Sequence, residues 1–144
     1  MKRFAALIVL GLLVCSARLE AADTESILRS VGSFALGGTG YAGTMSTGER
    51  ALRKILTHAD AIARLTSVLP EASPAGQLYA LLGLRARDRN AYEQALAKYG
   101  PRRATVETIS GCIVQRELFR DLVKRIDHGD YDSALARQWP DATR

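Results

Sequence analysis

The sequence is poor in the residues that build reactive and metal-binding sites, with only two cysteines and two histidines in 144 residues. His58 and His128 lie far apart, and no cysteines or histidines stand at the close spacings that zinc sites use. We therefore expect no metal ion and no cofactor. No catalytic residues are assigned either, because no local motif joins a nucleophile to a base and an orienting acid.

Cys112 is the one cysteine outside residues 1–21, so we expect no internal disulfide in the folded domain. It stands between Gly111 and the apolar pair Ile113-Val114. A free cysteine among apolar neighbours is typical of a small, buried hydrophobic side chain, and this is the interpretation we favour. A disulfide between two copies of the chain and a reactive thiol are the alternatives.

The chain also lacks an apolar segment long enough to span a bilayer, which takes about 20 residues. Its apolar run Phe4–Val14 has eleven residues and follows the basic start Met1–Arg3. A short basic region, a short apolar region and the small residues Ala21-Ala22 predict a signal peptide over residues 1–21. We therefore expect a periplasmic or secreted protein, with an uncleaved membrane anchor as the alternative.

Cys15 directly follows the apolar run and suggests a lipid anchor as a further alternative. This alternative is less favoured, because the residue before a lipidated cysteine is normally small and here it is Val14.

Removal of residues 1–21 leaves a single domain over residues 22–144 with a net charge of about +3. That charge is too small to name a partner by itself.

The stretch Ser73–Tyr99 predicts two helices joined at Asp88. Ser73 is a good N-cap, and Pro74 then occupies the first helical position, where its missing N–H costs nothing. In the body of the first helix only Gln77 is strongly polar. A helix that is apolar on nearly all sides is normally surrounded by other elements, so we expect this one at the centre of the fold.

The rest of the chain adds further helices and a short β region, and we expect a mainly α, single-domain helical bundle of about five helices with a small β-hairpin. The hairpin is predicted by β-branched residues in Thr105–Ile109, a turn at Ser110-Gly111 and a return strand over Cys112–Val114. The other expected elements are a helix ending at Val31, an extended or β segment over Ser33–Leu36, one long or two shorter helices after a capping box at Ser46–Glu49, a helix over Gln115–Ile126 and a last helix over Asp130–Gln138.

A glycine-rich loop, Gly37–Gly43, matches the pattern G-x-G-x-x-G. In dinucleotide-binding folds these glycines let backbone N–H groups approach a pyrophosphate between a strand and a helix. No β–α–β unit is predicted around this segment, so a structural loop is the favoured interpretation. Phosphate binding and presentation of Tyr41 to a partner are the alternatives.

Arginines gather at both ends of the second central helix, with Arg85, Arg87 and Arg89 near its start and Arg102 and Arg103 after its end. About 15 Å of helix separates the two groups, so they form one patch only if another element bridges them. They are candidate contacts for an anionic surface, because guanidinium groups bind carboxylates and phosphates in a bidentate manner. Solvated residues paired with local acids are the alternative. No aromatic residues interleave these arginines, so we expect no nucleic acid as a partner.

These absences and patterns predict a small, exported helical protein that binds or interacts rather than catalyses. The expected partner is another envelope protein or an anionic surface, with Tyr41 and the five arginines as candidate contacts. The alternative is a small enzyme of unrecognised type that uses Cys112 or the glycine-rich loop. The oligomeric state stays open.

Overall fold

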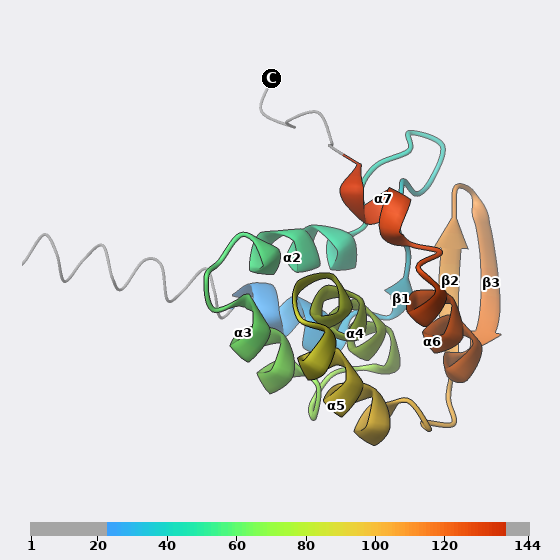
Figure 1. The fold of residues 1–144 in the computed structure, drawn as a ribbon. Helices are drawn as coiled ribbons and strands as arrows, with labels where there is room; N and C mark the ends of the chain where they lie inside the picture. The colour runs from blue at the N-terminus through green and yellow to red at the C-terminus, as the bar shows by residue number, and fades with distance from the viewer. Residues whose placement is uncertain (1–22, 138–144) are drawn as a thin grey trace, which may run out of the picture.

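Helix α4 (Pro74–Arg87) lies at the centre of the structure, a computed structural model that describes residues 23–137 (Figure 1). All ten residues of this helix from Ala75 to Leu84 are buried. Ser73 Oγ accepts a hydrogen bond from Gly76 N over 3.0 Å and so caps the helix. The predicted central position of this helix is confirmed.

Seven helices and a small three-stranded sheet make up one compact body in the described residues, against the five helices or so that we predicted. The long apolar stripe that follows Ser46 forms two helices, and α7 is an additional short one. The elements in chain order are a first helix over residues 23–30, β1 (Ser33–Phe34), α2 (Thr47–Leu56), α3 (Ala61–Val68), α4, α5 (Arg89–Tyr99), β2 (Thr105–Ser110), β3 (Ile113–Leu118), α6 (Phe119–His128) and α7 (Asp132–Ala136).

The first helix lies directly against the start of α4. Ser73 N donates to Arg29 O over 2.9 Å, and Ser73 Oγ donates to Val31 O over 2.6 Å. A Cβ atom on Gly76 would lie only 1.7 Å from Leu28 O. The close approach of the two helices therefore requires glycine at this position.

The three strands form a mixed sheet in the order β1-β2-β3 at one side of the helices (Figure 1). β2 and β3 are antiparallel, with Thr105 opposite Leu118 and Ser110 opposite Ile113. The predicted hairpin is therefore confirmed. β1 pairs in parallel with the other side of β2, so part of the predicted extended segment Ser33–Leu36 is a third strand.

Strand β3 is longer than predicted. The sequence predicts a helix from Gln115, but residues 113–118 are strand and α6 begins at Phe119. Phe119 N still donates to Ala104 O over 2.9 Å, so pairing with the β2 side continues to the end of the strand. The prediction was wrong because Gln115-Arg116-Glu117 contains no apolar residue that distinguishes a helical period from an alternating one.

Some predictions fall outside the described residues, namely the signal peptide over residues 1–21, Cys15 within it, and the end of the last helix at Gln138. Within residues 23–137, none of the helices has both the length and the apolar character needed to cross a membrane.

Candidate functional site

The glycine-rich loop and the hairpin turn meet at one end of the molecule (Figure 1). Gly40 N donates to Gly111 O over 2.8 Å. Thr39 and Thr44 exchange two backbone hydrogen bonds of 2.8 and 3.0 Å, which close the loop on itself. We call the segments that meet here, residues 39–44 and 110–113, the loop–hairpin end.

Four backbone N–H groups of the loop, those of Gly37, Thr39, Gly40 and Gly43, are used by the protein itself. Gly37 N donates to Glu49 Oε2 over 3.0 Å, and Gly43 N donates to Gly40 O over 3.1 Å. A phosphate site needs several free N–H groups aimed at one point, and these donors already have acceptors within the protein. This geometry favours the structural interpretation of the loop over phosphate binding.

Side chains with apolar surface are exposed at the loop–hairpin end. Tyr41 is fully exposed and Ile113 is 61% exposed. Cys112 is exposed too, so the predicted burial of this cysteine is wrong. The physical reason is that Gly111, with a φ of 56°, reverses the chain at the tip of the hairpin and places Cys112 beyond the packed core.

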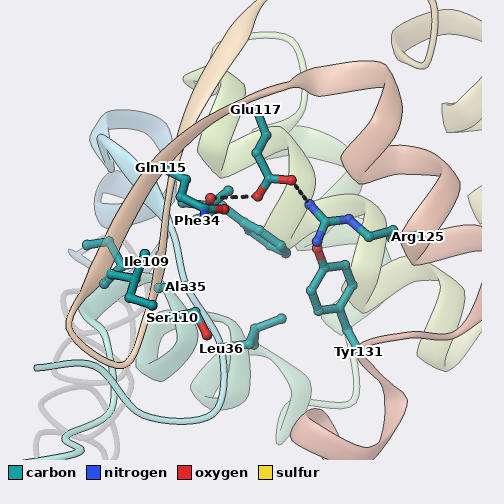
Figure 2. Close-up of a pocket in the computed structure, with 11 residues that line it drawn as sticks. Phe34, Ala35, Leu36, Ile109, Ser110, Gln115, Glu117, Arg125 and Tyr131 are labelled. Atoms are coloured by element: carbon teal, nitrogen blue, oxygen red, sulfur yellow. Dashed lines mark hydrogen bonds and ion pairs between the residues drawn. The ribbon is translucent and has the colours of Figure 1, made fainter.

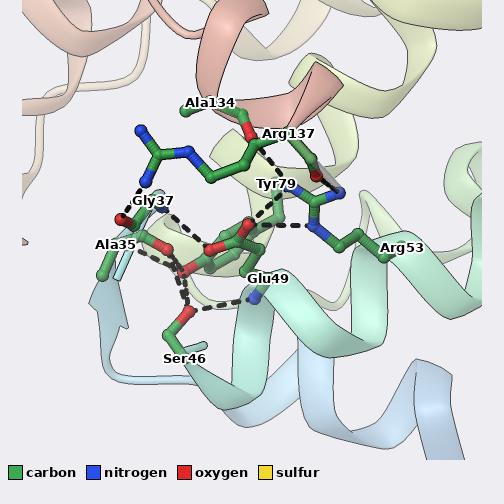
Figure 3. Close-up of polar contacts among 8 residues, drawn as sticks. All are labelled: Ala35, Gly37, Ser46, Glu49, Arg53, Tyr79, Ala134 and Arg137. Atoms are coloured by element: carbon green, nitrogen blue, oxygen red, sulfur yellow. Dashed lines mark hydrogen bonds and ion pairs between the residues drawn. The ribbon is translucent and has the colours of Figure 1, made fainter. Parts of the chain in front are cut away.

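A polar network holds the base of the loop (Figure 3). The Tyr79 hydroxyl donates to Ala35 O and accepts from Ala35 N, each over 2.8 Å. Ser46 Oγ donates to Ala35 O over 2.9 Å and accepts from Glu49 N over 3.1 Å, which is the Ser46 half of the predicted capping box. Burial raises the pKa of the Tyr79 phenol above its ordinary value.

Glu49 is the buried charge of this network. Its side chain has no exposed surface, and its carboxylate binds Gly37 N on one side and the Arg53 guanidinium on the other, where Arg53 Nη2 is 2.8 Å from Oε1. Arg53 in turn donates to Ala134 O over 2.8 Å and to Arg137 O over 3.0 Å. The network therefore ties the base of the loop to α7 and the residues after it.

A cleft of about 340 Å³ lies between the inner face of the sheet, Arg125 of α6 and Tyr131, which directly precedes α7 (Figure 2). Glu117 forms an ion pair with Arg125 and accepts a hydrogen bond of 2.7 Å from Thr108 Oγ1. The Arg125 guanidinium lies 5.8 Å from the centre of the Tyr131 ring. Burial raises the pKa of the Tyr131 phenol. The walls of the cleft therefore combine the Glu117–Arg125 ion pair with the apolar ring of Phe34.

The sequence did not predict this cleft. Glu117 was assigned to a helix, whereas in β3 it faces the same side of the sheet as Thr108 and meets Arg125 from α6. A volume of this size is at the lower end for small-ligand sites. Because Glu117 and Arg125 already neutralise each other, a ligand has to compete with their pairing.

Three of the predicted arginine contacts are occupied by the protein itself. Arg85 binds Asp132 of α7 over 2.6 Å, and Arg87 donates to a backbone carbonyl at the end of α2. Arg89 pairs with Glu93 over 2.9 Å. The alternative interpretation of paired local residues therefore fits this group better than an anion-binding one.

The second group of arginines lies beside a different element. Arg102 Nη1 donates to Oε1 of the buried Gln77 over 2.8 Å. Arg102 and Arg103 line an open groove of about 600 Å³ together with Arg120 at the start of α6. The two predicted groups line separate hollows, and Arg120 is a contact that the sequence did not indicate.

The residues considered for catalysis lie on different elements. His58 follows α2 and His128 ends α6, whereas Cys112 lies in the hairpin turn. In the part of the chain from residue 23 to residue 137, no group of three or more histidine, cysteine, aspartate or glutamate side chains is arranged to hold a metal ion.

Comparison with family models, with curated proteins and with solved structures gives no significant match to this chain. The functional argument therefore depends on the geometry of the chain itself.

Proposed function

We propose that the chain is an exported, non-catalytic interaction module and that another envelope protein binds its loop–hairpin end. The observation that carries this proposal is the hydrogen bond between Gly40 and Gly111, which joins the segments that expose Tyr41 and Ile113. Exposed aromatic and aliphatic side chains on one surface are typical of sites that bind proteins.

The attachment of the loop supports this role. Gly37 is held by the buried Glu49, and the loop closes on itself through Thr39 and Thr44. A loop that is already ordered loses little conformational entropy when a partner binds. Export is supported by the basic and apolar N-terminal pattern of residues 1–21.

Site-specific cross-linking tests the proposal. A photo-reactive benzoylphenylalanine replaces Tyr41 in one variant and, as a control, Ile62 in another, because Ile62 is also partly exposed but lies on α3. We expect a discrete protein adduct in the envelope fraction from position 41 and none from position 62. The same adducts from both positions, or none from position 41, contradict the proposal. Export is checked by the mass of the mature chain, which is expected to begin near Ala22.

A second candidate function, binding to an anionic surface, is favoured by the groove between Arg102, Arg103 and Arg120. Guanidinium groups from two elements are suited to phosphate-bearing lipid headgroups. We expect co-sedimentation with phosphatidylglycerol vesicles, not with phosphatidylcholine vesicles, and a steep loss of binding as salt rises. Arg103→Gln with Arg120→Gln is expected to abolish it, and binding that ignores both salt and these substitutions excludes this candidate.

A further inference from the structure

Strand β3 forms one edge of the sheet, and Figure 1 shows no other described element beyond it. The two-residue turn makes Ser110 and Ile113 a hydrogen-bonded pair. Phe119, six positions after Ile113, also directs its backbone N–H to the β2 side, where it donates to Ala104 O. The odd-numbered residues of β3 therefore direct their backbone groups to β2, and the even-numbered residues direct theirs to the free edge.

The free edge belongs to Val114, Arg116 and Leu118. Their side chains share the outer face of the sheet, because alternate residues of a strand face the same side. Val114 is 58% exposed and Leu118 is 44% exposed. Arg116 is exposed between them; Glu107 of β2 lies directly opposite it in the register, but Arg116 forms no ion pair within 4.0 Å among residues 23–137. An exposed edge of this kind is a template for pairing with another strand.

Arg116 disfavours a second copy of the chain as that strand. In the symmetric antiparallel register that pairs all three edge residues of two β3 strands, Val114 of each copy lies opposite Leu118 of the other, and Arg116 lies opposite Arg116. Like charges directly opposite each other in neighbouring strands destabilise the pairing. A strand with an acidic residue at the central position replaces this repulsion by an ion pair.

We propose that the free edge of β3 binds an extended segment of a partner protein that carries a carboxylate opposite Arg116 and apolar side chains opposite Val114 and Leu118. Backbone hydrogen bonds hold the added strand, and the three side chains select its sequence. The proposal rests on the proposed function, because β3 starts at Ile113 of the loop–hairpin end, and it adds the chemistry of the partner.

A pair of synthetic peptides tests the proposal. The first is a capped, fluorescein-labelled Thr-Val-Thr-Glu-Thr-Val-Thr, and the second has lysine in place of glutamate. By fluorescence anisotropy at low salt, the purified chain is expected to bind the glutamate peptide roughly threefold to tenfold more tightly. Arg116→Glu is expected to reverse this preference, because it changes the charge on the edge and leaves the backbone edge in place.

Proline at the edge separates backbone pairing from simple charge attraction. Val114→Pro removes an N–H that points away from β2, so the hairpin keeps its own hydrogen bonds while the edge loses a donor. We expect Val114→Pro to weaken peptide binding at least about tenfold. Val114→Thr keeps the N–H and is expected to retain the preference for glutamate. Circular dichroism confirms that both variants are folded.

Three results overturn the proposal: equal affinity of the wild-type chain for both peptides, normal binding by Val114→Pro, or no binding of either peptide. In the last case, sedimentation of the chain as a dimer would assign the edge to a second copy. Failure here leaves the cross-linking of position 41 unchanged, so the two proposals fail separately.

Discussion

Gly37 and Glu49 are joined by a hydrogen bond of 3.0 Å between the Gly37 N–H and Glu49 Oε2. Glu49 is completely buried, and Arg53, one turn further along α2, balances its charge. The glycine-rich loop is therefore attached at its base to a charged group inside the fold. A buried charge that has lost its partner is costly, so this attachment makes the loop sensitive to changes in the pair.

Removal of the Glu49 charge is expected to destabilise the fold. In Glu49→Gln the side chain keeps its size, but Arg53 loses a charged partner, so the free energy of unfolding is expected to fall by about 1.5–3 kcal/mol. Urea denaturation measures this loss. The control is Glu93→Gln, which breaks the exposed pair with Arg89 and is expected to leave the midpoint nearly unchanged. Equal losses in the two variants would show that Glu49 has no special role.

A methyl group at position 76 is expected to separate the first helix from α4. In Gly76→Ala the new Cβ meets Leu28 O at 1.7 Å, which is backbone and can move only with its helix. We expect a loss of about 1–3 kcal/mol or more in the free energy of unfolding. The matched control is Gly32→Ala, because a Cβ at position 32 meets nothing within 4 Å. The interpretation fails if thermal unfolding of the two variants coincides.

Local signals predicted much of this fold from the sequence. Ser73 caps α4 as predicted, and Asp88, the predicted junction, caps α5, because a short polar side chain followed by a helical period is a local pattern. The hairpin turn at Gly111 is local in the same way. The segment Gln115–Leu118 shows the limit, because its polar start has no period and only pairing with β2 decides for strand.

The candidate site depends on contacts between distant segments and was predicted only in part. Presentation of Tyr41 to a partner was one alternative for the loop. The hairpin turn that lies across the Gly40–Gly111 hydrogen bond is more than 60 positions further along the chain. Arg125 is only eight positions from Glu117, but the two side chains meet because β3 ends and α6 begins between them, which the sequence did not predict. No spacing in the sequence indicates such contacts, because they are set by the packing of α4 and the sheet.

Tyr79 and Tyr92 are both fully buried, but only one of the two hydroxyl groups is expected to contribute to stability. The Tyr79 hydroxyl binds both backbone groups of Ala35, whereas the Tyr92 hydroxyl lies beside the Asp127 carboxylate and forms no hydrogen bond of good geometry among residues 23–137. Tyr79→Phe leaves buried backbone groups unsatisfied and is expected to cost about 1–3 kcal/mol. Tyr92→Phe removes only the poorly aligned contact with Asp127 and is expected to cost much less. Chemical denaturation at neutral pH compares the two, and a similar cost for both contradicts the argument.

Cys112 is expected to be dispensable for folding and for partner binding. It lies exposed in the hairpin turn, so Cys112→Ser removes no buried contact and is expected to change the free energy of unfolding by less than about 0.5 kcal/mol. The native wild-type chain is expected to react with a thiol reagent without denaturant. The cross-linked adduct of position 41 should persist in Cys112→Ser. Loss of this adduct in Cys112→Ser would instead show that partner binding depends on the thiol and would favour the alternative of an enzyme that uses Cys112.

Alkaline pH is expected to destabilise the fold through Tyr92. Burial, together with the negative charge of Asp127, raises the pKa of the Tyr92 phenol to about 12. A tyrosine in the unfolded chain has a pKa of about 10. Between these values the folded chain keeps a proton that the unfolded chain has lost, so the stabilising contribution is complete below about pH 10 and is lost as pH rises toward about 12. The free energy of unfolding, measured in urea at steps across this range, is expected to fall by up to about 1.4 kcal/mol per pH unit from this group. Tyr92→Phe should show a shallower fall, and an identical slope in the variant would assign the pH dependence to other groups.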